Sequence, residues 1–598
     1  MNTPGSNETM EIASNNIIPL RADNPPQLEI LPQRAVVSSI PDGYEQLPDG
    51  IYFKPSNDEE AEPVFICTPL RVDALFCDND NKRWGRLVSV KTADDQWHEI
   101  PVLDAELFRR STDTIANLVD HGLELGNGKL AKEHLPVLLK GWKPVKRLLS
   151  VTRPGWVDDN YDAFLVGTKI IGSREVLPPT IPAVIRSGLT TKGVVEDWKQ
   201  NVGMKCQGNP LMILAVSLAF SGPLFAPLGM HGGGLHFRGA SSSGKSTLLK
   251  LAASVWGGHQ LISQWRATTN GLEAIAGSMN DLLLPLDEIA EISSRELPKA
   301  IYMLANGTGK TRMTTAVNLD EQARWRVALI SSGEISIMEK LSEGGEKTRD
   351  GHEVRLIDIE ADTRAYGVFD DLHGEASGAV FADKIQRAVA VHHGSVGLAF
   401  LGKLIEHGVE NILQRARSII GNCVSDWTAI LPSPPDGQTS RVAKRFAAIG
   451  FAGELATGCG LTGWETKDAL NAAKQAFLEW HDGRYSSRQE AVNQIVTPLQ
   501  EFLAANMNAL PDISGPHTTG GEQVGWRDAT RIYLPSTTWT SIYPGERGMK
   551  AAKALLGVQM LIPGDGNHLM KKAPHAIPGR PRLYTLNADQ VTRYKMRA

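Results

Sequence analysis

Residues 234–256, with the sequence GLHFRGASSSGKSTLLKLAASVW, are the most informative stretch of this chain about its fold. Its centre, GASSSGKS, runs from Gly239 to Ser246 and matches the phosphate-binding pattern G-x-x-x-x-G-K-[ST]. An apolar, strand-like segment precedes the motif and a helix-like segment follows it, which is the context that a phosphate-binding loop requires. A chance match in a glycine-rich chain is the alternative, and this context disfavours it. The stretch therefore predicts a parallel α/β core that binds a nucleotide.

The residues of this loop have distinct expected roles. Gly239 and Gly244 let the backbone curl so that N–H groups point at the phosphates, and the helix N-terminus adds the positive end of its dipole. Lys245 is expected to reach the β- and γ-phosphates of ATP, and the Ser246 hydroxyl to bind Mg²⁺. The predicted nucleotide-binding residues of the loop are Gly239, Ala240, Ser241, Ser242, Ser243, Gly244, Lys245, Ser246 and Thr247.

A pair of carboxylates follows downstream in DLLLPLDEIAE. An apolar run leads into Asp287 and Glu288, as expected for a buried strand that ends at the active edge of a parallel sheet. Asp287 is expected to hold Mg²⁺ through its water shell, and Glu288 to polarise the attacking water as a general base. Adjacent acidic residues are common on solvated surfaces, so the apolar run is what favours a site here.

The order of elements after the loop indicates which class of nucleotide-binding protein this is. Five strand-like segments alternate with helices, and one of them lies between the phosphate loop and the acidic strand, which describes an AAA+ type core. In that plan the fourth strand ends in a polar residue that senses the γ-phosphate. Ser331 and Ser332 in VALISSGEI are the candidates, and Ser332 is preferred. A plain serine at a strand end is the alternative.

Arginines are the candidates for completing the site. In oligomeric ATPases an arginine from a neighbouring subunit stabilises the transition state, because its guanidinium stays charged and donates several hydrogen bonds. Arg355 is the expected finger, with Arg349 and Arg312 in reserve. Arg441 and Arg445 are four residues apart on one helix face and are expected to reach the nucleotide from a lid. A structural ion pair for Arg355 and a solvated basic face for the other two are the alternatives.

Patterns along the chain predict five segments. Residues 1–62 hold eleven acidic and three basic residues with several breakers, which is typical of a disordered leader at the start. The tail from about residue 486 shows a helix, a helix and a strand pair in that order, which suggests a winged-helix module. The predicted segments are a disordered acidic leader (1–43), an α/β accessory domain (44–190), an AAA+ ATPase core (191–375), a helical lid (376–485) and a winged-helix-like domain (486–598).

Composition excludes several classes of protein. The 598 residues carry 62 Lys and Arg against 67 Asp and Glu, a net charge of −5, which argues against a histone-like binder. The five cysteines form no C-x-x-C pair, so neither a disulfide framework nor a zinc ribbon is expected. The apolar run LMILAVSLAF (211–220) is too short to cross a bilayer and predicts a buried helix. With no signal-peptide pattern, a cytoplasmic location without membrane association is expected.

Several stretches carry a resemblance to a known family. As a set they resemble the DUF927 helicases of bacterial mobile elements and prophages, often labelled DNA primase/helicase proteins, and are similar to the self-loading replicative helicases of staphylococcal cassette elements. The resemblance spans roughly residues 60–460. It is carried by WGRLVSVKTADDQWHEIP, PGWVDDNYDAF, GLHFRGASSSGKSTLLKLAASVWG, LLLPLDEIAE, IYMLANGTGKTRM, WRVALISSGEISI, VRLIDIEAD and RVAKRFAAIGFAGELA.

The family resemblance implies an ATP-dependent ring helicase, hexameric, that moves on single-stranded or forked DNA in the replication of a mobile element or prophage. A separate primase or initiator is a further candidate partner. Related ring helicases place a pore-facing hairpin where this chain has the insert 306–325, so Lys310 and Arg312 are expected to bind DNA phosphates. The basic stretch 571–598 makes the C-terminal module a candidate seat for duplex DNA.

Two other functions are compatible with the same motifs. An ATP-binding initiator or defence switch on DNA would not unwind it and would need no cationic pore insert. A protein remodeller would use the same motor without stimulation by DNA.

Overall fold

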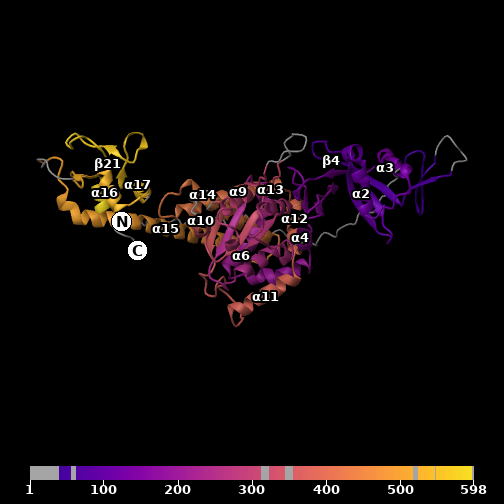
Figure 1. The fold of residues 1–598 in the computed structure, drawn as a ribbon. Helices are drawn as coiled ribbons and strands as arrows, with labels where there is room; N and C mark the ends of the chain where they lie inside the picture. Colours follow the sequence, from indigo (N-terminus) through magenta and orange to yellow (C-terminus); the bar gives the residue numbers. More distant parts are fainter. Residues whose placement is uncertain are drawn as a thin grey trace, which may run out of the picture. The chain divides into compact units, whose positions relative to one another are not determined.

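The computed structural model describes residues 40–54, 62–310, 322–343, 354–515, 523–545 and 547–594 (Figure 1). Most of the predicted leader, residues 1–43, lies outside these ranges. The chain forms two compact units, Met1–Phe477 and Leu478–Ala598. None of the described helices is both long and apolar enough to span a membrane.

The N-terminal part of the first unit is rich in strands. A five-stranded sheet has the order β11-β7-β4-β5-β6, and two three-stranded sheets adjoin it in sequence. The burial of β4 alternates along the strand, so one face packs on the core. Its elements are β1 (Tyr44–Leu47), β2 (Gly50–Phe53), β3 (Val64–Cys67), β4 (Leu70–Cys77), β5 (Gly85–Lys91), β6 (Trp97–Leu103), α1 (Asp104–Arg109), α2 (Ser111–Asp120), α3 (Lys129–Gly141), β7 (Arg147–Ser150), β8 (Gly155–Trp156), β9 (Ala163–Val166), β10 (Lys169–Gly172), β11 (Val176–Leu177) and α4 (Ala183–Gly188).

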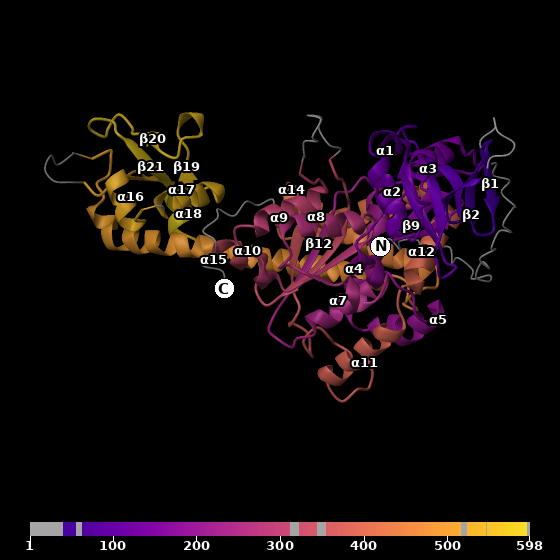
Figure 2. The same cartoon turned by 45° about the vertical axis from the view of Figure 1, so that its right-hand side comes forward.

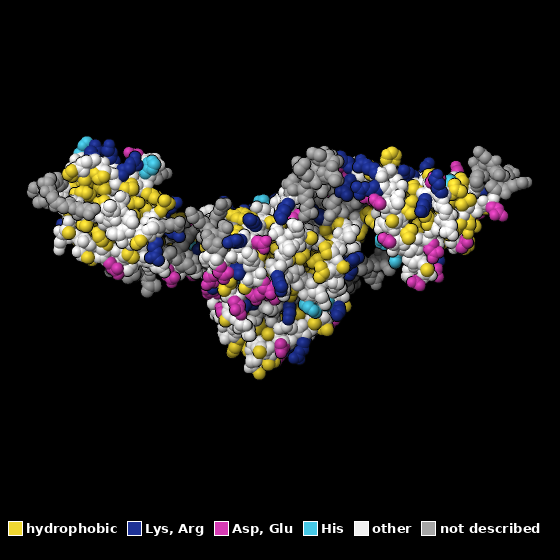
Figure 3. All heavy atoms as spheres, viewed as in Figure 1, with side chains coloured by type: hydrophobic (Ala, Val, Ile, Leu, Met, Phe, Trp, Pro, Cys, Tyr) yellow, Lys and Arg dark blue, Asp and Glu magenta, His cyan; other side chains and the backbone are white. Residues whose placement is uncertain are grey.

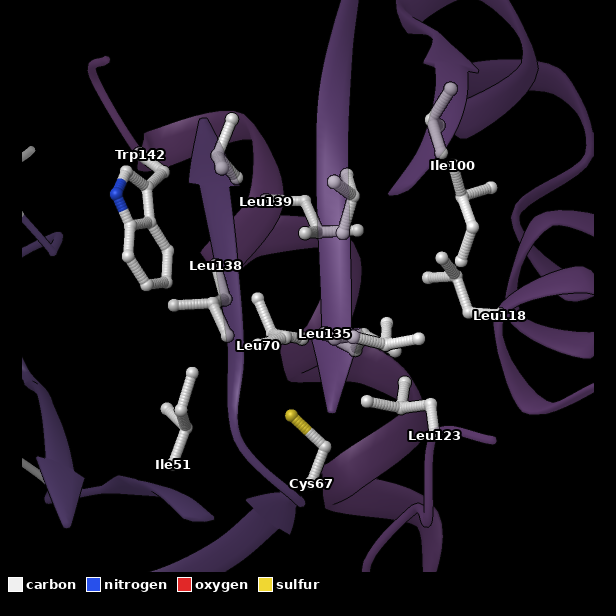
Figure 4. Packing of buried hydrophobic residues seen from close by; sticks show 14 of the residues in the cluster. Ile51, Cys67, Leu70, Ile100, Leu118, Leu123, Leu135, Leu138, Leu139 and Trp142 are labelled. Carbon is white, nitrogen blue, oxygen red and sulfur yellow. The ribbon is translucent and has the colours of Figure 1, made fainter. Parts of the chain in front are cut away.

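A hydrophobic core holds this part together. Helix α3 contributes three leucines spaced for one helix face, and these pack with apolar residues of β2, β3 and β4. Figure 4 shows Leu135, Leu138 and Leu139 beside Ile51 and Leu70. Burial of this face fixes α3 against the strands, and with it the position of the C-terminal end of the helix.

The centre of the first unit is a five-stranded parallel sheet with the order β13-β14-β15-β12-β16. Figure 2 shows β12 with α8 and α9 on one side and α7 on the other. Because every strand runs the same way, all five carboxyl ends meet at one edge. The elements are α5 (Val195–Trp198), α6 (Pro210–Phe225), β12 (Gly233–Arg238), α7 (Lys245–Ala253), β13 (Ser263–Gln264), α8 (Thr269–Ser278), β14 (Leu283–Asp287), α9 (Leu297–Asn306), β15 (Ala328–Gly333), α10 (Ile337–Glu343) and β16 (Leu356–Glu360).

The apolar run 211–220 lies in helix α6, and every residue from Leu211 to Phe225 is buried. This confirms the expected buried helix. Helix α14 packs on α6, and a Cβ at Gly453 would come within 2.2 Å of the Ser217 hydroxyl oxygen. The glycine therefore permits the close approach of the two helices.

Helices dominate after β16. Asp436 caps α14, since its carboxylate accepts a hydrogen bond from the Thr439 amide at 2.6 Å. Ser377 caps α11 in the same way, at 3.3 Å from the Val380 amide. The helices are α11 (Gly378–Val391), α12 (Ser395–His407), α13 (Val409–Ala429), α14 (Gly437–Gly458) and α15 (Asp468–Asn506).

The second unit contains the end of α15 and a small antiparallel sheet with the order β17-β18-β21-β19, with β20 paired to β21. Its core joins Val496, Leu499 and Leu503 of α15 to Trp539 of α16 and Leu555 of α17. The elements after α15 are β17 (Trp526–Arg527), β18 (Arg531–Leu534), α16 (Ser536–Ile542), α17 (Arg547–Gly557), β19 (Leu561–Ile562), β20 (Lys571–Lys572), β21 (Arg582–Asn587) and α18 (Ala588–Thr592).

Candidate nucleotide site

The loop after β12 has the geometry of an anion-binding turn. Ser242 and Gly244 take left-handed backbone angles, with φ of 62° and 102°, and α7 begins at the next residue, Lys245. A Cβ at Gly244 would lie 2.6 Å from the Val368 Cγ2 atom, so only glycine fits both the angle and the space. The loop thus turns directly into a helix N-terminus, where backbone N–H groups favour a bound anion.

The side chain of Lys245 lies inside this loop. It is 8 % exposed, and its Nζ donates to the carbonyl oxygens of Gly239 and Ala240 at 2.8 Å and 2.6 Å. The Ser243 hydroxyl is 3.4 Å from the same nitrogen. The ammonium is therefore placed at the centre of the loop, where it can exchange carbonyl contacts for phosphate oxygens.

A carboxylate already binds one amide of the loop. Asp362, just beyond β16, accepts a hydrogen bond from the Ala240 N–H at 2.7 Å. The loop amide therefore donates a hydrogen bond to an anionic oxygen in this geometry. Phosphate oxygens of a nucleotide have the same chemistry, so the residues present fit a nucleotide.

The predicted carboxylates lie at the same edge of the sheet. Asp287 is the last residue of β14, and Glu288 follows it with a φ of 58°, a strained angle for a side chain of this size. One oxygen of Asp287 accepts hydrogen bonds from the Ser332 hydroxyl and from the Glu288 amide. Burial, and second the charge of Asp287, raises the pKa of Glu288 above its usual value. Such a carboxylate is a better base than an ordinary exposed one.

The two candidate sensor serines face different partners. Ser331 is fully buried, and its hydroxyl oxygen is 2.8 Å from the Trp265 indole nitrogen and 2.9 Å from His236 Nδ1. The second ring nitrogen of His236 donates to the Ile335 carbonyl at 3.0 Å. Ser332 instead reaches the Asp287 carboxylate. Since side chains alternate along a strand, only Ser332 lies beside the predicted catalytic carboxylates.

Ser246 and Thr247 also differ in their surroundings. Ser246 is exposed at the start of α7, which leaves its hydroxyl accessible for Mg²⁺. Thr247 is 3 % exposed and its hydroxyl accepts a hydrogen bond from Gln386 of α11 at 3.3 Å. Lys250 donates to the same glutamine at 2.6 Å. The Thr247 side chain therefore contributes to the contact between α7 and α11.

The structure does not bring Arg445 to the phosphate loop, which corrects the prediction made from its helix spacing. Its guanidinium donates to the carbonyl oxygen of Gly232 at 3.0 Å, at the amino end of β12. Burial lowers the pKa of Arg445 to about 10. The six residues of β12 span about 20 Å at ~3.3 Å each, so Arg445 lies at the wrong end of the strand for its own nucleotide.

The other two predicted arginines that the structure describes are Arg355 and Arg441. Arg355 immediately precedes β16, and its Nε donates to Asn306 Oδ1 at 3.1 Å. Its guanidinium covers the Tyr302 ring at 4.3 Å from the centroid. Arg441 is exposed on α14, one turn before Arg445.

The insert predicted to bind DNA is only partly described. The Gly309 amide donates to the Ala323 carbonyl at 2.8 Å, so the chain enters and leaves the segment 311–321 as an antiparallel pair. Lys310 is exposed and donates to Asn270 Oδ1 at 3.3 Å. Arg312 and Arg349 lie outside the described residues.

Three further residues, Asp362, His236 and Trp265, lie near the site and were not predicted from the sequence. Asp362 could have been predicted, because it follows a predicted strand, just as Ser332 lies at the end of one. His236 and Trp265 had no such signal. The Trp265 amide donates to the Asp287 carbonyl at 3.1 Å while its indole binds Ser331, so it joins β13, β14 and β15.

Comparison with known proteins bears on the family and the fold. Residues 44–324 match the family described as "Domain of unknown function (DUF927)". The solved structure described as "SCCmec type IV Cch - active helicase" has a TM-score of 0.64 and 19 % identity, and the match covers 92 % of this chain and 98 % of that chain. No curated protein matches the sequence.

A second solved structure is much less similar. "The A form apo structure of NrS-1 C terminal region-CTR" matches with a TM-score of 0.25 and 9 % identity, over 68 % of this chain and 90 % of that chain.

The predicted resemblance to the DUF927 family is confirmed over residues 44–324. The likeness to the cassette helicase extends over nearly the whole chain and shows a shared mixed α/β fold.

Proposed function

We propose that this protein is an ATP-dependent DNA helicase or translocase of the AAA+ type that acts as an oligomeric ring. One observation carries the proposal. The phosphate loop with Lys245, the Asp287–Glu288 pair and the Ser332 hydroxyl converge at one edge of one parallel sheet. Strand β15 stands between the loop strand β12 and the acidic strand β14, which supports the AAA+ assignment.

The residues divide the chemistry as follows. Lys245 and the loop amides hold the phosphates of ATP. Ser246 and Asp287 would hold Mg²⁺, which neutralises phosphate charge when bound. Glu288 accepts the proton of the attacking water, and Ser332 keeps the Asp287 carboxylate oriented. None of these roles places an arginine of the same subunit against the charge that develops on the phosphate in the transition state.

An oligomer supplies that arginine. Arg355 and the phosphate loop lie at opposite ends of the sheet, since β16 separates Arg355 from the Asp362 that contacts Ala240. Arg355 therefore acts on the nucleotide of a neighbouring subunit, in a ring for which six is the proposed number. Lys310 and Arg312 would bind DNA in the pore of that ring. Replication of a mobile element or prophage, with a primase or initiator as partner, follows from the family resemblance.

The second unit adds a candidate duplex-binding module. Helices α16 and α17 and the antiparallel strands β18, β21 and β19 occur in the order of a winged helix, and the end of α15 supplies a third helix. Helix α17 carries the exposed cations Lys550 and Lys553. This arrangement supports a helix that lies against DNA phosphates.

Strand displacement with matched lysine variants tests the proposal. Lys245→Ala is expected to abolish ATP hydrolysis and unwinding of a forked substrate. Lys250→Ala, on the same helix but bound to Gln386, is expected to keep both. ATP hydrolysis without unwinding of any fork would favour the initiator or switch. Hydrolysis that no DNA stimulates would favour a protein remodeller.

A further inference from the structure

The N-terminal part of the first unit exposes two aromatic rings, each beside a cation. Trp84 is 43 % exposed and Phe108 is 81 % exposed. The Arg147 guanidinium lies 5.5 Å from the centre of the Trp84 ring, and the Lys140 ammonium lies 5.2 Å from that of Phe108. Both pairs combine a flat apolar surface with a positive charge.

A buried arginine connects the chain segments that carry these two pairs. Arg86 forms an ion pair with Asp104 at 2.8 Å and also donates to the Leu139 carbonyl, next to Lys140. The Asp104 amide donates to the Trp84 carbonyl at 3.0 Å. Asp104 begins α1 and Phe108 lies four residues on, about 6 Å along the helix axis at ~1.5 Å per residue. One backbone hydrogen bond and one helical turn thus connect the residues that carry the two rings.

The charge around the rings is positive. Segments 82–86, 104–110 and 140–147 contain nine Lys or Arg residues and two acidic ones. Three of the nine cations are in ion pairs, Arg86 with Asp104, Lys82 with Asp80 and Lys146 with Glu175. No acidic residue occurs between Glu133 and Asp158. Figure 3 shows lysine and arginine side chains beside hydrophobic ones on the N-terminal part. Six of the exposed cations are Arg83, Arg109, Arg110, Lys140, Lys143 and Arg147.

We propose that this basic–aromatic edge, formed by the three segments, binds single-stranded DNA. Unpaired bases stack on exposed aromatic rings without regard to sequence, while cations bind the phosphates. Duplex DNA hides the faces of its bases, and an acidic protein segment would need the cations without the rings. The proposal concerns binding alone, so it stands whether or not the chain unwinds DNA.

The same domain contains a matched control. Trp97 is 38 % exposed, and the Arg71 guanidinium lies 4.3 Å from its ring centre. It begins β6, whereas Gly85, next to Trp84, pairs with Leu103 at the other end of that strand. Six residue steps separate the two ends, about 20 Å at ~3.4 Å each. Arg71 is paired with Asp73 at 2.7 Å, so the charge around Trp97 is not positive.

The test measures binding of a fluorescent oligothymidylate by anisotropy, with the full chain and no nucleotide. Trp84→Ala/Phe108→Ala is expected to weaken binding about tenfold or more, because stacking contributes to each bound base. Trp97→Ala is expected to bind like the unmodified protein. Lys140→Glu/Lys143→Glu is expected to weaken binding and to reduce its salt dependence. ATP hydrolysis without DNA should be unchanged in all of these variants, which separates a failure here from a failure of the motor.

Three results would overturn the proposal. The first is that Trp84→Ala/Phe108→Ala binds the oligonucleotide as tightly as the unmodified protein. The second is an equal loss of binding to duplex DNA. The third is an equal loss of binding to heparin, a polyanion without bases, which would assign the edge to an acidic protein partner.

Discussion

The Ser332 hydroxyl donates a hydrogen bond to the Asp287 carboxylate, which ties the end of β15 to the end of β14. The same carboxylate oxygen of Asp287 also accepts a hydrogen bond from the Glu288 amide at 3.1 Å. The hydrogen bond from Ser332 therefore couples the position of the end of β15 to the carboxylates Asp287 and Glu288 at the end of β14. Movement of either strand end would therefore change the geometry around Glu288.

Removal of the Ser332 hydroxyl should slow hydrolysis more than it weakens nucleotide binding. Ser332→Ala leaves the Asp287 carboxylate without a charge-assisted hydrogen bond, which is worth about 1.5–3 kcal/mol. The expected result is a fall in kcat of roughly tenfold or more with little change in KM, measured by steady-state ATP hydrolysis. Ser342→Ala, an exposed serine on α10, is the control and should be neutral. An unchanged kcat in Ser332→Ala would remove this serine from the site.

The acidic limb of the pH profile of kcat should lie at a higher pH than it would if Glu288 titrated like an ordinary glutamate. Burial and the Asp287 charge raise its pKa, so the carboxylate takes up a proton sooner as the pH falls and ceases to act as a base. The exposed Glu334 contributes to the raised pKa of Glu288 by repulsion. Glu334→Gln should move the limb of kcat slightly to lower pH, and salt should suppress that difference. A shift in the opposite direction would contradict the role of Glu288.

Acid should destabilise the first unit through His236. Burial lowers the pKa of His236 to about 4, whereas the unfolded chain titrates at 6.5. Between these values the unfolded state binds the extra proton, so the stabilisation is complete above pH 6.5 and is lost as the pH falls to about 4, up to roughly 3 kcal/mol. His236→Gln should therefore show a flatter pH dependence of the thermal unfolding midpoint. His98→Gln, at an exposed position, should follow the unmodified protein.

Mixed oligomers should reveal the role of Arg355. Arg355→Ala alone is expected to lower kcat about a thousandfold, as loss of an arginine finger does. Mixing Arg355→Ala subunits with Glu288→Gln subunits creates interfaces that have both an intact Arg355 and an intact Glu288. ATP hydrolysis should partly return at such interfaces. Its absence at every mixing ratio would argue against action between subunits, and Arg295→Ala should leave kcat unchanged.

The insert should couple DNA to hydrolysis. Lys310→Ala/Arg312→Ala is expected to keep hydrolysis in the absence of DNA and to lose both DNA stimulation and strand displacement, because each cation is assigned to a DNA phosphate. Lys299→Ala, an exposed lysine on α9, is the control. Normal unwinding by the double variant would show that the pore contacts lie elsewhere.

Much of the candidate site could be predicted because its parts are local in sequence. The phosphate loop is eight consecutive residues, and Asp287 and Ser332 each lie at or next to the end of an apolar run. A parallel sheet then brings the ends of such runs to one edge. The choice between Ser331 and Ser332 was harder, because both follow the same apolar run. It depends on which face of β15 meets Asp287 and which meets His236 and Trp265.

The candidate nucleotide-binding loop, the acidic pair and the alternation of strands and helices could be predicted from the amino-acid sequence, since these depend on short patterns with fixed backbone geometry. Three relationships became visible in the folded chain alone: Arg445 contacts Gly232 instead of the loop, Asp362 binds the Ala240 amide, and the Trp84 carbonyl accepts a hydrogen bond from Asp104, one helical turn before Phe108. Each of these relationships joins residues far apart in the chain. Such contacts arise from packing of one element on another, and no local pattern encodes the distance at which two helices or strands meet.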